Sequence, residues 1–195
     1  MRKIEIIALE GFPEIKPYDD LSKIILETAK KNNVQFEDFD ILVIAHKIVS
    51  KSEGRIVDLE NVRPSNEAYR LSHLTGKDPK LIEVILSESR EVVKALKGHL
   101  IVENVQGIVC ANAGVDKSNV GGGKRLVLLP KDPDYSAKII CENLMKLTGK
   151  KLALIISDTY GRMLREGQVD MAIGLYGIYP FKDYRGKSDM FGYTL

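Results

Sequence analysis

Two short segments of the chain are apolar at every position, residues 41–45 (Ile-Leu-Val-Ile-Ala) and residues 152–156 (Leu-Ala-Leu-Ile-Ile). The run 41–45 predicts a strand that is apolar on both faces, as in a covered sheet, and the run 152–156 predicts another buried strand. Residues 4–9 predict a further buried strand. At about 100–200 residues per domain, a chain of 195 residues makes one large domain or two small ones. We therefore expect residues 1–195 to fold as a single α+β domain in which helices and strands are mixed.

Helical patterns with clear ends separate these runs. The residues expected to cap or start them are Asp19 or Asp20, Ser65, Asp78, and Asp134 or Ser136. The expected ends lie near Asn32-Asn33, before Gly76, and at Gly149. Residues 100–103 and 107–111 predict a pair of strands, and the segment from His46 to Arg55 predicts a polar, basic turn.

The composition excludes several classes of function. Lys and Arg number 29 and Asp and Glu 27, a net charge of +2, so bulk charge does not make the chain a nucleic-acid binder. The sequence has neither a signal-peptide pattern nor the ~20 apolar residues that span a bilayer. Cys110 and Cys141 lack the spacing of a zinc site or a disulfide framework. We expect a cytoplasmic protein with no nucleic-acid or membrane partner.

Acidic residues follow two of the expected strands. Asp158 and Thr159 come directly after the apolar run 152–156, and Asp116 lies shortly after the strand that ends at Ala111. In open α/β sheets, ligands gather beyond the carboxyl ends of strands. Carboxylate and hydroxyl oxygens are ligands for Mg²⁺ or Mn²⁺, which is often shared with substrate phosphates. The alternative is that both aspartates serve only as turn and cap residues.

Basic residues gather beside these acids in the sequence. Lys47, Lys51 and Arg55 lie in the polar segment after the run 41–45, where a lysine could contact phosphate, or the segment could form a solvated face. Arg162 and Arg165 follow Asp158 closely and would suit a polyanionic substrate. The stretch Gly121–Lys124 does not match a Walker A loop, and no G-x-S-x-G motif supports serine hydrolysis.

Taken in order, the motifs resemble the coenzyme F-420-0:γ-glutamyl ligase family. The matching segments span nearly the whole chain: Glu10-Gly11-Phe12-Pro13, residues 47–55, residues 112–116 with Ser118-Asn119-Val120, Leu129-Pro130 with Asp132-Pro133-Asp134, Ile156-Ser157-Asp158-Thr159 with Gly161-Arg162, Ala172-Ile173-Gly174, and Asp183-Tyr184-Arg185-Gly186. Each block alone is weak, and their common order makes the resemblance specific.

The resemblance implies a GTP-dependent ligase that adds L-glutamate to the deazaflavin precursor F-420-0. Members of the family are thought to phosphorylate the terminal carboxylate of F-420-0, after which the glutamate amine attacks the acyl phosphate. A second glutamate is then added by a γ-linkage. The resemblance also implies two sites for Mg²⁺ or Mn²⁺, a K⁺ requirement, a mixed αβ fold of the ligase type and a homodimer.

Site residues follow from the same resemblance. Asp116 and Asp158 are expected to be catalytic and to bind metal, with Thr159 at a second metal. The expected nucleotide contacts are Phe12, Pro13, Glu14, Ile15, His46, Lys47, Lys51 and Asn119.

Two features depart from the family pattern. The first is in the expected nucleotide site, where Glu14 replaces an apolar residue and His46 replaces a small polar one. The second is length: we expect residues 1–195 to lack the family's C-terminal segment, which contributes further GTP contacts and a metal ligand. The alternatives to the ligase are therefore a nucleotide- or metal-binding homologue or truncated fragment without ligase turnover, and an unrelated metal-dependent phosphohydrolase.

Overall fold

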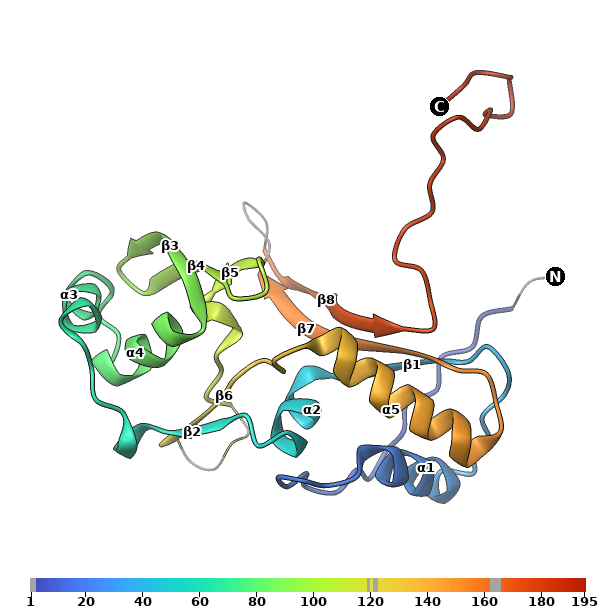
Figure 1. The fold of residues 1–195 in the computed structure, drawn as a ribbon, viewed down its shortest axis with the longest axis horizontal. Helices are drawn as coiled ribbons and strands as arrows, with labels where there is room; N and C mark the ends of the chain where they lie inside the picture. The colour runs from blue at the N-terminus through green and yellow to red at the C-terminus, as the bar shows by residue number, and fades with distance from the viewer. Residues whose placement is uncertain (1–2, 119, 121–122, 162–165) are drawn as a thin grey trace.

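The computed structural model describes residues 3–118, 120, 123–161 and 166–195. Its helices are α1 (Leu21–Lys31), α2 (His46–Ser52), α3 (Asn66–Thr75), α4 (Pro79–Ser87) and α5 (Pro133–Thr148). Its strands are β1 (Ile41–Ala45), β2 (Ile56–Asp58), β3 (Ser89–Leu96), β4 (His99–Asn104), β5 (Val109–Ala111), β6 (Arg125–Val127), β7 (Ala153–Gly161) and β8 (Gln168–Tyr176). The mixed α+β class is confirmed, and the elements form two lobes (Figure 1).

The first lobe is a sheet in the order β1-β7-β8, with β1 parallel to β7 and β8 antiparallel to it. Helices α1 and α5 lie on the same face of this sheet (Figure 1). Leu42 and Ile44 of β1 point into that core, whereas Val43 is 63% exposed. The prediction that residues 41–45 are covered on both faces is therefore wrong, because both helices cover the same side.

The second lobe is the antiparallel sheet β3-β4-β5 packed against α3 and α4. Leu71, Ile82, Ile85 and Leu100 are buried in its core. Burial of this many branched side chains is the main stabilising term of such a lobe, at about 25 cal/mol per Å² of apolar surface removed from water. The expected strand pair at 100–103 and 107–111 is confirmed as β4 and β5.

The short antiparallel pair β2–β6 runs between the lobes (Figure 1). Arg55, just before β2, binds Glu88 at the end of α4 with Nη2 2.6 Å from Oε2. Its Nε also donates to the Leu129 carbonyl at 3.0 Å. Because Arg55 and Glu88 are both mostly buried, this ion pair ties the second lobe to the connecting strands instead of facing a ligand.

Most of the predicted helix caps agree with the caps in the structure. Asp20, Ser65 and Asp78 accept hydrogen bonds from the first turns of α1, α3 and α4, as predicted. Helix α5 is capped by Asp132, two residues before the expected start. The expected turn after β1 is wrong: residues 46–52 form α2, whose cap position, Ala45, makes no side-chain hydrogen bond.

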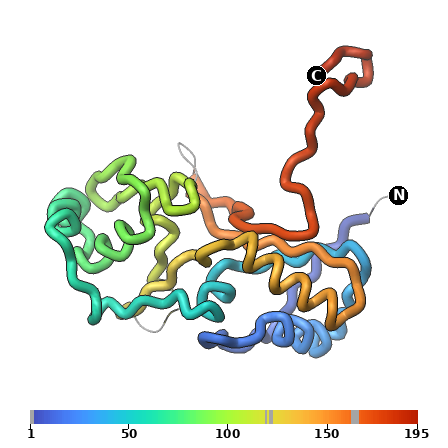
Figure 2. Tube along the Cα trace, viewed as in Figure 1, coloured from blue at the N-terminus to red at the C-terminus, as the bar shows by residue number. Residues whose placement is uncertain are grey.

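The two ends of the described chain project from the lobes (Figure 2). Residues 4–9, predicted as a buried strand, form neither a strand nor part of the core, and Ile6 is 93% exposed. An extended segment becomes a strand only when a neighbour takes up its backbone hydrogen bonds, and these residues have none in the described chain. Residues 177–195 also run outward, with Tyr179 and Phe181 exposed. Among the described helices, none is long and apolar enough to cross a membrane.

Candidate active site

The start of α2 brings the two predicted acids to one place. Ala45 of β1 pairs with Ser157 of β7 in the parallel register, so the next residues, His46 and Asp158, lie side by side. His46 Nε2 is 3.2 Å from Asp158 Oδ1. The neighbouring Lys47 places its Nζ 2.5 Å from Asp116 Oδ2. Two adjacent residues of one helix thus contact acids from distant parts of the chain.

Neighbouring groups contact only one oxygen of the Asp158 carboxylate in the described part of the chain. Its Oδ1 accepts the backbone N–H of Thr159 at 2.7 Å and also faces His46. The His46 side chain is only 3% exposed, and its Nδ1 lies 3.3 Å from Ser50 Oγ. Within the described residues, Asp158 Oδ2 has no hydrogen-bond partner. One oxygen of the carboxylate is therefore fixed in place and the other is available to a ligand.

Asp116 is oriented by its own loop and by Lys47. Its backbone forms a bridge with Val127, which anchors it beside β6. Ser118 donates its N–H to Oδ1 at 2.9 Å and its hydroxyl to Oδ2 at 2.7 Å. Desolvation by partial burial opposes ionisation, but the Lys47 ammonium and the Ser118 hydrogen bonds outweigh it and lower the pKa of Asp116 to about 2. Asp116 is an anion at neutral pH, and Lys47 compensates its charge.

A second lysine of α2 reaches the loop that the family resemblance marks for nucleotide binding. The stem of Lys51 is buried, and its Nζ lies 2.6 Å from Oε1 of Glu14, a side chain that is 75% exposed. Phe12 and Ile15 pack against the core of the first lobe, while Pro13 is exposed. The apolar residues on either side therefore anchor the loop and present Glu14 to Lys51.

The donor set fits a hard divalent cation. Asp116, Asp158 and Thr159 supply carboxylate and hydroxyl oxygens, which are the ligands that Mg²⁺ and Mn²⁺ prefer. Thr159 Oγ1 already donates to Asp170 Oδ1 at 3.1 Å. No group of three or more His, Cys, Asp or Glu side chains forms a metal cage in the described residues. A cation bound to these oxygens would therefore have to take further ligands from water or substrate.

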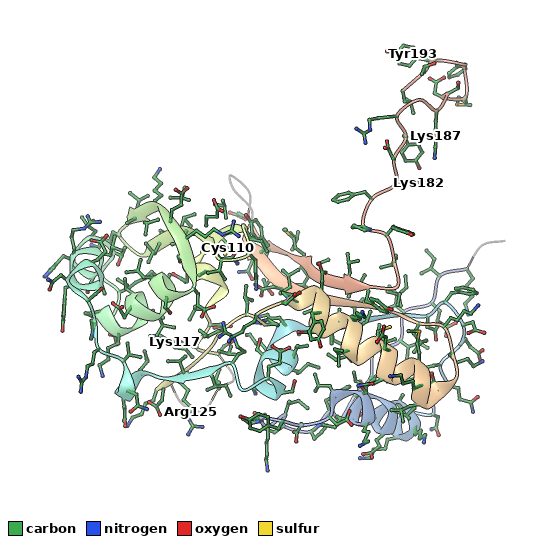
Figure 3. All side chains as sticks on the ribbon, viewed as in Figure 1. Cys110, Lys117, Arg125, Lys182, Lys187 and Tyr193 are labelled. Carbon is green, nitrogen blue, oxygen red and sulfur yellow. The ribbon has the colours of Figure 1, made fainter. Side chains whose placement is uncertain are left out.

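Cys110 borders this site, although nothing in its sequence position indicated it. Desolvation and the nearby charge of Asp158 raise the pKa of the Cys110 thiol to about 11. Its strand, β5, approaches β7, where the Tyr160 hydroxyl donates to the Val109 carbonyl. Figure 3 shows Cys110 where these strands meet. Only the tertiary contact between β5 and β7 reveals this neighbour.

A cavity of about 490 Å³, open to solvent, has Asp116 in its wall. It lies between the turn that joins α3 to α4 and residues 112–117. The sequence placed both turns correctly but gave no signal that they would face each other. Lys77 and Lys117, which line the cavity, are therefore additional candidates that sequence reasoning missed.

Some predicted residues lie elsewhere or outside the described chain. Asn119, Arg162 and Arg165 are among the residues that the structure does not describe, as are Gly121 and Gly122. Arg55, from the same basic segment as Lys47 and Lys51, is engaged by Glu88. The described site therefore consists of the two acids, Thr159, His46, the two lysines and the loop at residues 12–15.

Comparison with known proteins supports the resemblance seen in the motifs. The sequence profile of the family described as F420-0:Gamma-glutamyl ligase matches residues 11–195. A protein of Methanothermobacter thermautotrophicus named Coenzyme F420:L-glutamate ligase is 44% identical over 192 residues, covering 98% of this chain and 76% of the relative. Relatives of the same name from Methanocaldococcus jannaschii and Methanopyrus kandleri are 45% and 42% identical, covering 100% and 99% of this chain and 75% and 73% of their own lengths. The chain belongs to the F420-0:γ-glutamyl ligase family.

Proposed function

We propose that this protein is a GTP-dependent ligase that joins L-glutamate to F-420-0. The observation that carries the proposal is the contact of His46 with Asp158 and of Lys47 with Asp116, which brings both acids to the start of α2. The substrates come from two printed names: the relatives are each named Coenzyme F420:L-glutamate ligase, and the family is described as F420-0:Gamma-glutamyl ligase. Neither the nucleotide nor the chemical intermediate is contained in those names, so both are part of the proposal.

The proposed reaction has two steps. The terminal carboxylate of F-420-0 attacks the γ-phosphorus of GTP, which forms an acyl phosphate and releases GDP. The glutamate amine then attacks the acyl carbon, the C–O bond to phosphate breaks, and an amide and inorganic phosphate are formed. A second round on the new γ-carboxylate adds another glutamate by a γ-linkage.

The chain's own residues would carry out the positioning in this scheme. Asp116, Asp158 and Thr159 would hold two Mg²⁺ or Mn²⁺ ions, which neutralise charge on the transferred phosphoryl group. Lys47, released from Asp116 when a cation takes that carboxylate, would have its ammonium available to phosphate oxygens. Because the Lys51 ammonium already binds an exposed carboxylate, Glu14, it can exchange that partner for a phosphate.

The nucleotide site would include Phe12, Pro13, Glu14, Ile15, His46, Lys47, Lys51 and Asn119. We also propose the K⁺ requirement and the homodimer that the family resemblance implies. The dimer is supported by exposed apolar side chains on the two projecting ends, among them Ile4, Ile6 and Phe181, which a second subunit could bury. Light scattering of the purified protein at several concentrations tests it.

One incubation separates the ligase from its alternatives. The protein is mixed with F-420-0, L-glutamate, GTP, KCl and MnCl₂, and the products are weighed by mass spectrometry. We expect F-420 species that carry one and two added glutamyl units, with GDP formed in proportion. GDP without glutamyl product would instead indicate a phosphohydrolase. Nucleotide binding without either product would indicate a homologue that lacks ligase turnover.

A further inference from the structure

The cavity beside Asp116 is a second candidate binding site. Its volume is about 490 Å³, within the range of small-molecule sites, and Asp116 forms part of its wall. Leu81 and Val115 contribute apolar surface, and Lys77, Asp78 and Lys117 contribute charged groups. The cavity therefore adjoins the place where we propose phosphoryl transfer, and it has its own set of side chains.

The backbone at the edge of this cavity is strained. Asn112 and Ala113 adopt left-handed conformations with φ of 54° and 55°, which asparagine tolerates and which alanine adopts at a cost. Asn112 lines the cavity, yet its Oδ1 is buried without a hydrogen-bond partner in the described chain. Strained backbone and unsatisfied polar atoms concentrate at functional sites, where the surrounding structure imposes them.

The charged groups around the cavity are available to a ligand. Neither the Lys77 nor the Lys117 ammonium contacts a carboxylate or carbonyl among the described residues. Figure 3 places Lys117 beside α4. Asp78 uses Oδ1 to accept the Lys80 N–H at 2.8 Å, which caps α4, and its Oδ2 has no partner in the described part of the chain. The cavity thus offers two cations, Lys77 and Lys117, and two anions, Asp78 and Asp116, of which Asp116 is already paired with Lys47.

We propose that this cavity binds the incoming L-glutamate, an inference that rests on the proposed ligase function. Glutamate carries two carboxylates and one amine, which match the two ammonium groups of Lys77 and Lys117 and the carboxylate of Asp78. Its methylene groups would face Leu81 and Val115. Because Asp116 is also in the cavity wall, glutamate bound here would adjoin the place where we propose that the terminal carboxylate of F-420-0 is activated.

Kinetics of single lysine variants test this assignment. We expect Lys77→Ala and Lys117→Ala each to raise the KM for L-glutamate about tenfold, the effect of losing one charge-assisted hydrogen bond. The KM values for GTP and F-420-0 should not change. Lys138→Ala, which removes an exposed lysine of α5, is the matched control and should leave all three constants unchanged.

The role of Asp78 can be tested without disturbing α4. Asparagine caps helices as well as aspartate, so Asp78→Asn keeps the cap and removes only the charge. We expect this variant to bind glutamate more weakly while its inhibition by glutarate, which has no amine, stays the same. A purely structural role of Asp78 would change both ligands equally and would overturn the assignment.

A binding measurement separates this inference from the proposed function. Saturation-transfer NMR of free L-glutamate with the unmodified protein should show binding that Lys77→Ala weakens and Lys138→Ala does not. If ligation proceeds normally and neither lysine variant changes the KM for glutamate, the cavity is not the glutamate site. A rise in the KM for GTP or F-420-0 alone would also overturn it. If glutamate binds as described but no glutamyl product forms, the glutamate site stands and the ligase function fails.

Discussion

His46 and Asp158 touch because β1 and β7 are parallel neighbours whose last paired residues are Ala45 and Ser157. The imidazole is enclosed between Ser50 on its own helix and Asp158 on the next strand. A buried imidazole with both nitrogens engaged has one available orientation, so it restricts the carboxylate that it contacts. This geometry makes His46 a positioning residue for the Asp158 carboxylate.

Changing His46 should therefore weaken metal binding. Partners that orient a metal ligand typically contribute 10–100-fold to metal affinity. We expect His46→Ala to lower Mn²⁺ affinity by about 10-fold or more, measured by electron paramagnetic resonance of free Mn²⁺. His46→Gln retains a donor and should recover part of the loss. Equal Mn²⁺ affinity in the unmodified protein and in His46→Ala would disprove the positioning role.

Removing either acid should abolish ligation and leave the fold intact. Asp116→Ala and Asp158→Ala each delete a carboxylate at the edge of the site, where no core packing depends on it. We expect product formation to fall by at least about 100-fold, because stabilisation of charge in the transition state is lost. Circular dichroism should match that of the unmodified protein. Normal glutamate incorporation by either variant would remove that residue from the metal site.

Lys51→Ala should weaken GTP binding more than it weakens folding. The partner of Lys51 is a carboxylate that faces water, so loss of the ion pair costs little stability. Loss of the buried stem adds a packing cost, and Lys51→Met, which keeps an apolar stem, separates that cost from the loss of the charge. Loss of a charge-assisted contact to phosphate lowers affinity about tenfold. Calorimetry with GTP measures the effect, and Lys138→Ala, which removes an exposed lysine of α5, is the control and should leave GTP affinity unchanged. An unchanged GTP affinity in Lys51→Ala would exclude Lys51 from the nucleotide site.

The contact of Asp116 with Lys47 should appear in the acid unfolding of the protein. The folded-state pKa of about 2 lies below the ordinary value of 3.8, so the ionised carboxylate stabilises the folded state above that value. This contribution is lost as the pH falls from 3.8 through about 2. Denaturant melts of the unmodified protein and Asp116→Asn should differ at pH 6, and the difference should shrink below pH 4. A difference that is constant across this range would contradict the shifted pKa.

Metal binding should make Cys110 more reactive. Burial, followed by the charge of Asp158, raises the pKa of this thiol to about 11, so it is protonated at neutral pH. A cation bound at Asp158 cancels the second cause, and we expect Mg²⁺ to speed alkylation of Cys110 by iodoacetamide severalfold. Peptide mass spectrometry follows each cysteine, with the buried Cys141 as the internal control. Asp158→Asn should remove the Mg²⁺ effect; if it persists, the cation acts elsewhere.

Much of the local structure was predictable from short-range chemistry. Asp20, Ser65 and Asp78 cap helices because their side chains accept hydrogen bonds from residues only two or three positions ahead. Gly76 and Gly149 end helices because the left-handed conformation there costs glycine nothing. By contrast, α2 lacks a capping side chain, so the sequence of residues 46–52 predicts a turn where the structure has a helix.

The site was only partly predictable, because several of its contacts join segments that are far apart in the sequence. The order of the motifs indicated the family and named Asp116, Asp158, Lys47 and Lys51 as a group. Nothing in the chain indicated that His46 would be buried against Asp158, or that Cys110 would border that carboxylate. These contacts depend on the register of one strand against another.

The sequence by itself determined most helix ends other than those of α2, the apolar runs that became β1 and β7, and the residue types that can bind metal and phosphate. These follow from interactions within a few residues of each other. The tertiary structure alone decided which face of the β1-β7-β8 sheet is covered, that residues 4–9 remain unpaired, and that two acids meet at the start of α2. Such outcomes depend on which distant segments pack together, because burial and strand pairing are satisfied only by partners elsewhere in the chain.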